Sequence, residues 1–206
     1  MVVKKTDIGL ILLAAGNSTR MGQCKYLLPL LNGKTFYENI VRSFFEFGIE
    51  KIIVVTQSKY SKELKSIFKD EEKQPYIIIN HFPEKERFYS LQLGIKALDT
   101  SEYCFIHNAD SPFVKQETLQ QLAASKHSAD YVCPVFKGKS GHPILVNKKT
   151  LHHLINCSEQ NNLRDELKKL KRNNIEVRSN EIVVDIDTQD DYKNILASIG
   201  SAQVVE

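Results

Sequence analysis

A short apolar run near the start of the chain, Ile8 to Leu13, gives way at once to small and polar residues. The run has the length of a strand, and no polar residue alternates with the apolar ones, so both faces of that strand are expected to be buried. Strands buried on both faces belong to α/β folds, in which helices cover the two sides of a mainly parallel sheet. This segment therefore constrains the fold more than any other.

The residues after this strand, from Ala14 to Lys25, have the composition of a loop that contacts phosphate groups. Ala14, Ala15 and Gly16 are small, so the backbone can turn sharply and approach a ligand closely. Hydrogen-bonding groups and positive charge then come from Asn17, Ser18, Thr19, Arg20 and Lys25. The loop is not a P-loop, because five residues rather than four separate Gly16 from Gly22, and it is not Gly-x-Gly-x-x-Gly.

The pattern from Leu13 to Lys25, Leu-Ala-Ala-Gly-x-Ser-x-Arg-Met-Gly-x-x-Lys, resembles the nucleotide-binding signature of the sugar-nucleotidyltransferase-like superfamily. It is most similar to the molybdenum cofactor cytidylyltransferases, and next to the methylerythritol phosphate cytidylyltransferases. The resemblance implies a three-layer α/β/α domain with the Rossmann-like nucleotide-diphospho-sugar transferase fold. It also implies that Arg20 and Lys25 are catalytic and that the nucleotide is bound by Leu13, Ala14, Ala15, Gly16 and Ser18.

Length and composition agree with one domain over residues 1–206, with residues 1–6 and 200–206 frayed at the ends. The hydrophobic fraction of 42% and the charged fraction of 26% are those of ordinary globular proteins. A net charge of +3 is too small to suggest a nucleic-acid partner. No run approaches the length of a membrane span, and the N-terminus does not resemble a secretory signal.

The four cysteines, Cys24, Cys104, Cys133 and Cys157, include no Cys-x-x-Cys, so neither a zinc knuckle nor a redox pair is indicated. Free thiols favour a cytoplasmic protein. Cys24 lies inside the glycine loop, where it is either a reactive thiol or a small filler residue.

Apolar periodicity predicts alternating strands and helices along the rest of the chain. Strands are predicted at 52–55, 76–79, 103–107, 131–136 and 182–188, and helices at 36–47, 58–68, 91–98, 116–125 and 189–199. Thr35 is suited to begin the first helix and Gly48 to end it. The basic cluster at 168–172 is interpreted as the solvated face of a helix.

Arg87 and Ser90 precede the predicted helix at 91–98, at a position where the related cytidylyltransferases contact the base and phosphates. Ser90 could equally cap the helix. Arg87 gains nothing from the positive end of a helix dipole, which favours another partner for its charge. Both are therefore predicted to bind nucleotide.

Asp110 directly follows a predicted strand, as the Gly16 loop does, and the carboxyl ends of parallel strands meet along one crevice. The two segments are therefore expected to meet, although Asp110 could instead cap the helix near Gln116. Resemblance to the family's Gly-Asp-x-Pro implies that Asp110 binds Mg²⁺ or Mn²⁺. The Asp185-Ile-Asp-Thr motif resembles a second part of that metal site. The resemblance implies that the first of these aspartates, Asp185, completes the metal site with Asp110. Alternation would put Asp185 and Asp187 on one side of a strand, so Asp187 is the alternative ligand.

The acceptor side is predicted from weaker resemblances. Gly141-His142-Pro143 is similar to a Gly-His-Pro loop that lines the acceptor side in molybdenum cofactor cytidylyltransferases, although His142 could be an ordinary loop histidine. Arg164 is retained from the family's Gly-Asp-x-Gly-Ala-Arg segment, but the glycines and the aspartate are not. This departure leaves the identity of the acceptor open.

Together these features predict a nucleotidyltransferase that transfers a nucleoside monophosphate to a phosphorylated acceptor and releases pyrophosphate. The double-alanine loop favours CTP over GTP as donor. Molybdopterin is the leading acceptor, which would make a molybdoenzyme a protein partner; a phospho-sugar alcohol such as methylerythritol phosphate is the alternative. A hypothesis of another class is a non-catalytic nucleotide-binding partner of a molybdoenzyme.

Overall fold

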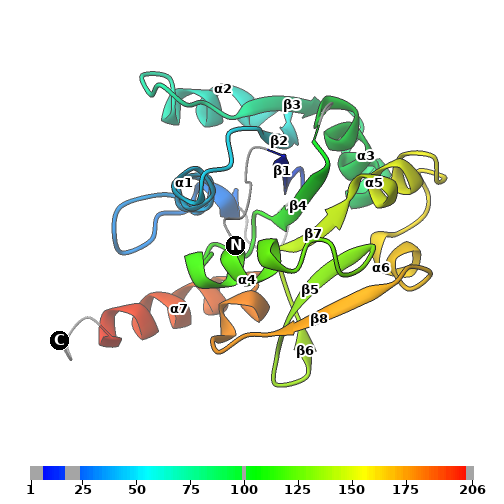
Figure 1. The fold of residues 1–206 in the computed structure, drawn as a ribbon. Coiled ribbons are helices and arrows are strands. Elements are labelled where there is room, and N and C mark those ends of the chain that lie inside the picture. Colours follow the sequence, from blue (N-terminus) through cyan, green and yellow to red (C-terminus); the bar gives the residue numbers. More distant parts are fainter. Residues whose placement is uncertain (1–6, 17–23, 99–100, 203–206) are drawn as a thin grey trace.

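A computed structural model gives the fold and describes residues 7–16, 24–98 and 101–202 (Figure 1). Its strands are β1 (Ile8–Ala14), β2 (Ile52–Gln57), β3 (Tyr76–Asn80), β4 (Tyr103–Asn108), β5 (Tyr131–Phe136), β6 (Lys139–Ser140), β7 (Ile144–Asn147) and β8 (Arg172–Glu176). The α-helices are α1 (Phe36–Phe47), α2 (Ser58–Ile67), α3 (Glu86–Leu98), α4 (Gln116–Ala124), α5 (Lys148–Ile155), α6 (Leu163–Leu167) and α7 (Gln189–Ala202). Short 3₁₀ turns are η2 (Lys25–Leu27), η3 (Pro83–Lys85) and η4 (Asn180–Val183).

The described strands form one sheet in the order β3-β2-β1-β4-β7-β5-β6, with β8 beside β5. Strands β1 to β4 are mutually parallel, whereas β7 runs antiparallel to both β4 and β5. The predicted α/β class with a mainly parallel core is confirmed. The sheet therefore has two unlike halves, a parallel one around β1 and a mixed one around β5.

The first strand is the centre of the parallel half, because it pairs with β2 on one side and β4 on the other. Every residue of β1 is buried. Leu10 and Leu12 belong to one hydrophobic cluster, and Ile11 and Leu13 belong to the other. Alternate residues thus point into two cores, which explains why the run has no polar side.

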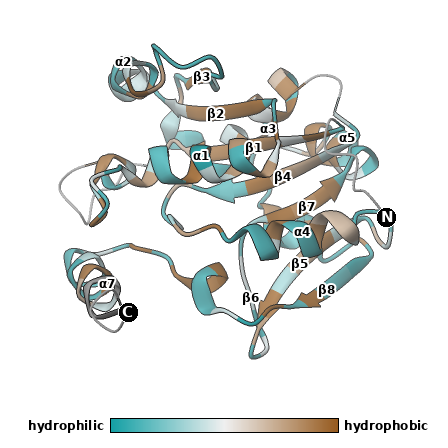
Figure 2. Cartoon of the chain, turned by 60° about the vertical axis from the view of Figure 1, so that its left-hand side comes forward, coloured by the Kyte–Doolittle hydropathy of each residue, from teal (hydrophilic) through white to brown (hydrophobic). Residues whose placement is uncertain are grey.

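Helices cover both faces of the sheet, as predicted for three layers. Apolar residues of α1, α2, α4 and α7 join the first cluster, and those of α3, α5 and α6 join the second. Figure 2 shows the apolar strands between these helices, with α7 standing at the margin of the molecule. Helix α1 has the predicted ends: the Thr35 side chain accepts from the Glu38 amide, and Gly48 is left-handed. No helix in residues 7–16, 24–98 and 101–202 is long and apolar enough to cross a membrane.

Several predicted boundaries are wrong in the second half of the chain. Residues 182–188 do not form a strand: η4 ends at Val183, and an irregular segment leads to α7. Its backbone makes isolated bonds instead of a ladder, since the Ile186 amide donates to the Asp110 carbonyl and the Ile182 carbonyl accepts from His142. The chain end is also more regular than predicted, because α7 continues to Ala202.

The basic cluster at 168–172 is not the face of a helix. Helix α6 ends before Lys168, and Arg172 begins β8. Neither β8 nor α5 was predicted. Strand β8 reads Arg-Asn-Asn-Ile-Glu, and its residues are alternately exposed and half-buried. A strand that borders the sheet through β5 alone needs little apolar surface, so its pattern is weak.

Candidate active site

A cavity of about 490 Å³ opens at the carboxyl ends of β1 and β4. Residues Leu13 and Asn108 are paired in the β1–β4 ladder, and the Ala109 amide donates to the Leu13 carbonyl. This pairing brings the two strand ends together, as the sequence predicted. The lining includes Leu13, Ala14, Ala15, Gly16, Lys25, Arg87, Ser90, Asp110 and Asp187.

Lys25 links two of the predicted metal ligands. Its Nζ donates to Oδ1 of Asp187 at 2.7 Å and to Oδ2 of Asp110 at 3.1 Å. Burial would lower the pKa of Lys25, but the carboxylates of Asp110 and Asp187 outweigh burial and raise it. Only 14% of the Lys25 side chain is exposed. The lysine therefore lies as a charged group between two carboxylates, and not as the free loop cation that its sequence context suggests.

Asp110 is almost buried and has an unused acceptor. Its side chain is 11% exposed, and within the described residues its Oδ1 has no hydrogen-bond partner. A buried carboxylate oxygen without a donor is costly unless a cation or water contacts it. Asp110 does not cap α4, because that helix begins after Lys115 without a side-chain cap. Its oxygen chemistry, with that of Asp187, fits Mg²⁺ or Mn²⁺.

Arg87 and Ser90 lie in α3, which begins at Glu86, earlier than predicted. Arg87 is thus in the first helical turn, and its guanidinium lies 3.7 Å from Oδ2 of Asp110. Ser90 does not cap the helix. Its hydroxyl donates to the Glu86 carbonyl and accepts from Asn80, which joins α3 to the end of β3. Both side chains line the smaller cavity; their nucleotide contacts remain predictions.

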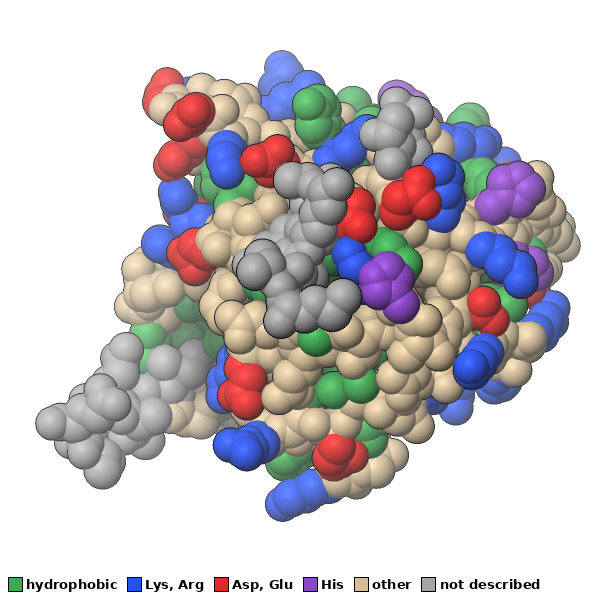
Figure 3. Space-filling view, viewed as in Figure 1, with side chains coloured by type: hydrophobic (Ala, Val, Ile, Leu, Met, Phe, Trp, Pro, Cys, Tyr) green, Lys and Arg blue, Asp and Glu red, His purple; other side chains and the backbone are tan. Residues whose placement is uncertain are grey.

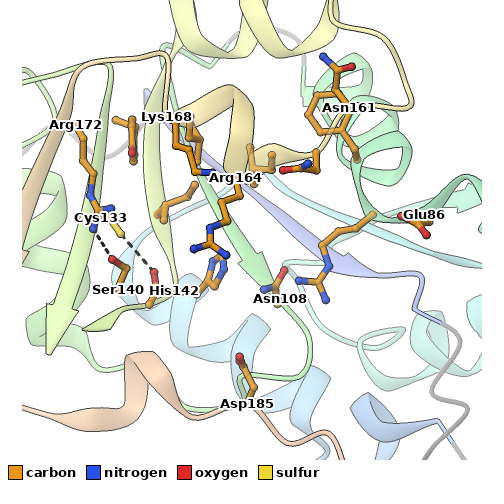
Figure 4. Close-up of a pocket in the computed structure, with 18 of the residues that line it drawn as sticks. Glu86, Asn108, Cys133, Ser140, His142, Asn161, Arg164, Lys168, Arg172 and Asp185 are labelled. Carbon is orange, nitrogen blue, oxygen red and sulfur yellow. Dashed lines mark hydrogen bonds between the residues drawn. The ribbon is translucent and has the colours of Figure 1, made fainter. Parts of the chain in front are cut away.

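A larger cavity, of about 1310 Å³, lies on the mixed half of the sheet (Figure 4). Its lining includes His142, Arg164 and Asp185, and Arg87 lines both cavities. The guanidinium of Arg164 points toward His142 in Figure 4. Further cationic groups in the lining are Lys85, Lys139, Lys168 and Arg172. The two predicted acceptor-side residues are thus in one cavity.

Asp185 and Asp187 belong to different environments. The Ser111 hydroxyl donates to Oδ1 of Asp185, and Asp185 lines the larger cavity. Asp187 lines the smaller cavity with Lys25. The expectation that alternation puts both on one side was wrong, because the segment is not a strand. In this structure the carboxylate that shares Lys25 with Asp110 is that of Asp187.

The Gly141-His142-Pro143 loop is held against η4. A Cβ on Gly141 would lie 1.9 Å from the Ile182 carbonyl oxygen, so only glycine fits there. The His142 amide donates to the same carbonyl. Burial lowers the pKa of His142, which keeps its ring neutral near pH 7. A neutral imidazole ring has one nitrogen that donates a hydrogen bond and one that accepts.

The remaining predictions concern Ser18, Arg20 and Cys24. Ser18 and Arg20 lie outside the described residues. Cys24 is buried, and burial raises its pKa to about 11, so the structure supports the filler interpretation. Ser111, Lys168 and Arg172 were not predicted from the sequence as site residues. The only signal for the last two was the basic cluster, which the structure places on the turn between α6 and β8 and at the start of β8.

Comparisons with known proteins identify the family of this chain. Residues 10–174 match the family model described as the MobA-like NTP transferase domain. The chain belongs to this family. It is therefore a nucleotidyltransferase-family enzyme. Of the signature residues, Leu13, Ala14, Ala15, Gly16 and Lys25 line the cavity at the ends of β1 and β4.

Two relatives of this chain are named for different nucleotides. A molybdenum cofactor cytidylyltransferase of Escherichia coli (strain K12) is 31% identical over 90% of this chain and 93% of its own length. A probable molybdenum cofactor guanylyltransferase of Carboxydothermus hydrogenoformans is 24% identical over 92% of this chain and 95% of its own length. This NTP transferase chain is thus similar to proteins named for two different nucleotides.

Solved structures show the same fold. The 4-diphosphocytidyl-2C-methyl-D-erythritol synthase of Anaerococcus prevotii matches with a TM-score of 0.76 at 18% identity, over 96% of this chain and 100% of the other. A Mycobacterium tuberculosis protein crystallised with manganese matches with a TM-score of 0.76 at 18% identity, over 94% and 100%. The predicted nucleotidyltransferase fold is confirmed.

Proposed function

We propose that this enzyme transfers CMP from CTP to a phosphorylated acceptor, with molybdopterin as the leading acceptor. A phosphate oxygen of the acceptor attacks the α-phosphorus of CTP. The bond from that phosphorus to the bridging oxygen breaks, and pyrophosphate leaves with both electrons of that bond. The contact of Lys25 with Asp110 and Asp187 at the Gly16 loop carries this proposal, because it joins a cation to carboxylates where phosphates would bind.

Phosphoryl and nucleotidyl transfers depend on alignment and on neutralising charge. Asp110 and Asp187 would hold Mg²⁺ or Mn²⁺, which supplies positive charge to phosphate oxygens when bound. Lys25 would then leave the carboxylates and donate to the triphosphate. Arg87, which lines both cavities, would contact phosphate between donor and acceptor.

The described residues leave open space beside Gly16. A Cβ built on Gly16 meets no atom of the described residues within 4 Å. The amides of residues 15–21 are proposed to donate to the β- and γ-phosphates, in the way that small-residue loops bind anions. The predicted contacts of Ser18 and Arg20 belong to this part of the proposal.

The larger cavity is proposed as the acceptor site. Its lining carries several cationic side chains, which suits a phosphorylated acceptor. His142 and Arg164 would both contact the acceptor. The segment that departs from the family pattern, residues 158–164, forms part of this lining. The acceptor could therefore differ from molybdopterin, with methylerythritol phosphate as the alternative.

Calorimetry with CTP, GTP and ATP, each with Mg²⁺, tests the donor. The proposal expects CTP to bind most tightly, because the loop has the double-alanine form. A clear preference for GTP would overturn the choice of CTP and favour a guanylyltransferase. Pyrophosphate release with molybdopterin and with methylerythritol phosphate then tests the acceptor. Release with neither, despite CTP binding, would favour the non-catalytic partner of a molybdoenzyme.

A further inference from the structure

Three side chains of different chemistry meet outside both cavities, where α5 approaches α6. His153 is in the last turn of α5, Cys157 follows four residues later, and Glu166 is in α6. An imidazole nitrogen, the thiol sulfur and a carboxylate oxygen all lie within 4.8 Å of one another. The proposed mechanism does not use these residues.

The separations of these atoms are close to those of ligands on one metal ion. Nε2 of His153 is 2.9 Å from Oε2 of Glu166 and 3.7 Å from Sγ of Cys157. Two ligands of a tetrahedral zinc ion, each ~2.0–2.3 Å from the metal, lie about 3.3–3.7 Å apart. Small side-chain movements would therefore place all three atoms around one ion.

The two oxygens of Glu166 have separate surroundings. Lys169 and Asn161 both donate to Oε1 at 2.7 Å, which leaves Oε2 directed at His153. Metal-binding carboxylates are commonly held in this way by donors on the other oxygen. The backbone of Cys157 is held as well, because Gln92 of α3 donates to its carbonyl at 2.9 Å.

We propose that His153, Cys157 and Glu166 form a zinc site separate from the nucleotide cavity. Nitrogen, sulfur and oxygen donors suit Zn²⁺, and Co²⁺ as its spectroscopic substitute, whereas the oxygens of Asp110 and Asp187 suit Mg²⁺. Binding releases the thiol proton of Cys157, and His153 binds through Nε2 as a neutral ring with its remaining N–H on Nδ1. The thiolate and the carboxylate then balance the two positive charges of the ion.

The proposed zinc site is open to solvent on one side and lies next to the larger cavity on the other. The His153 side chain is 38% exposed, so an ion can enter from solvent and keep a water as fourth ligand. Asn161, which donates to Glu166, also lines the larger cavity. Zinc bound to Glu166 would therefore restrain Asn161 and, through it, the wall of the larger cavity. The site itself does not depend on the proposed function.

Cobalt titration of the whole, metal-stripped protein tests the site. The wild-type chain should show a thiolate-to-cobalt charge-transfer band that saturates at one ion per chain and disappears when Zn²⁺ is added. Cys157→Ser should abolish the band, and His153→Ala should weaken cobalt binding at least tenfold. His152→Ala is the matched control, since His152 is an exposed neighbour on α5, and it should keep the wild-type titration.

Two results would overturn the zinc site. One is the absence of a thiolate band in the wild-type protein; the other is a band that persists in Cys157→Ser, which would assign the thiolate to another cysteine. Circular dichroism establishes that the variants are folded. Asp110→Asn separates this test from the proposed function, because it should remove metal-dependent CTP binding and leave the cobalt band intact.

Discussion

The two cavities are built in different ways. The smaller one stands at the ends of β1 and β4, whose ladder fixes the relative positions of Leu13 and Asn108. The larger one is lined by a hairpin, short helices and the irregular segment after η4. In the first, the backbone of the sheet sets the geometry. In the second, side-chain contacts and isolated hydrogen bonds set it, so its specificity is freer to differ among relatives.

Charges of both signs are mixed on the face of the molecule seen in Figure 3. Figure 3 shows Lys and Arg side chains interspersed with Asp and Glu over the face viewed in Figure 1. Discrimination between donor and acceptor is therefore expected to come from individual residues inside the cavities. Substitutions in each cavity, each paired with a control variant, test whether the smaller cavity binds the donor and the larger one the acceptor.

The largest effect is expected from Lys25→Ala, in the smaller cavity. Losing one cation on the reacting phosphates should lower kcat by about 100–1000-fold, by analogy with loss of a single oxyanion donor. Pyrophosphate release at saturating substrates measures it, with the exposed Lys65→Ala as control. Because Lys25 is paired with Asp110 and Asp187, some loss of stability is also expected. Unchanged kcat would remove Lys25 from the mechanism.

Smaller effects are expected from Asp187→Asn and Asp185→Asn, and the two variants should differ in which quantity changes, the Mg²⁺ dependence or the KM for the acceptor. Asp187 shares Lys25 with Asp110, so its loss should raise the Mg²⁺ concentration needed for half-maximal rate by about 10-fold or more, as expected for an interaction of ~1.5–3 kcal/mol. Asp185→Asn should leave the Mg²⁺ dependence near wild type and raise the KM for the acceptor.

The exposed Asp190→Asn controls for the change in net charge near α7. The reverse outcome, with Mg²⁺ dependence shifted by Asp185→Asn alone, would move the metal to the larger cavity. It would also show that the ion pair of Asp187 with Lys25 is structural.

These substitutions also mark where prediction from the sequence succeeds. The Gly16 loop and Asp110 could be placed together because parallel strands end along one crevice. Asp185 and Asp187 could not be told apart, because the alternation of Ile182, Val184 and Ile186 suggested a strand that tertiary packing does not form. Likewise, the cavity role of Arg172 depends on β8, whose polar sequence gives no strand signal.

Arg172→Ala tests the larger cavity directly. A charged contact to an anionic acceptor is worth ~1.5–3 kcal/mol, so the KM for the acceptor should rise by about tenfold while the KM for CTP stays unchanged. Lys171→Ala is the control, because Lys171 is exposed beside it and its side chain is not in the cavity lining. A rise in the KM for CTP instead would show that the two cavities do not divide donor from acceptor.

The smallest effect should come from Glu166, which holds the wall of the larger cavity. The Lys169 ammonium, followed by His153, lowers the pKa of Glu166 from its usual 4.5 to about 2. A lowered carboxyl pKa stabilises the fold above the unfolded pKa, and this contribution is lost as pH falls from about 4.5 toward 2.

Glu166→Gln should therefore reduce the free energy of unfolding by about 2 kcal/mol at pH 7, as expected for charged hydrogen bonds. The difference from wild type should narrow below pH 4.5. Chemical unfolding between pH 7 and pH 3, with a chelator present to remove metal, measures it, and the exposed Glu46→Gln is the control. A difference that stays constant with pH would mean that Glu166 acts through packing, and the wall of the larger cavity would then not depend on its charge.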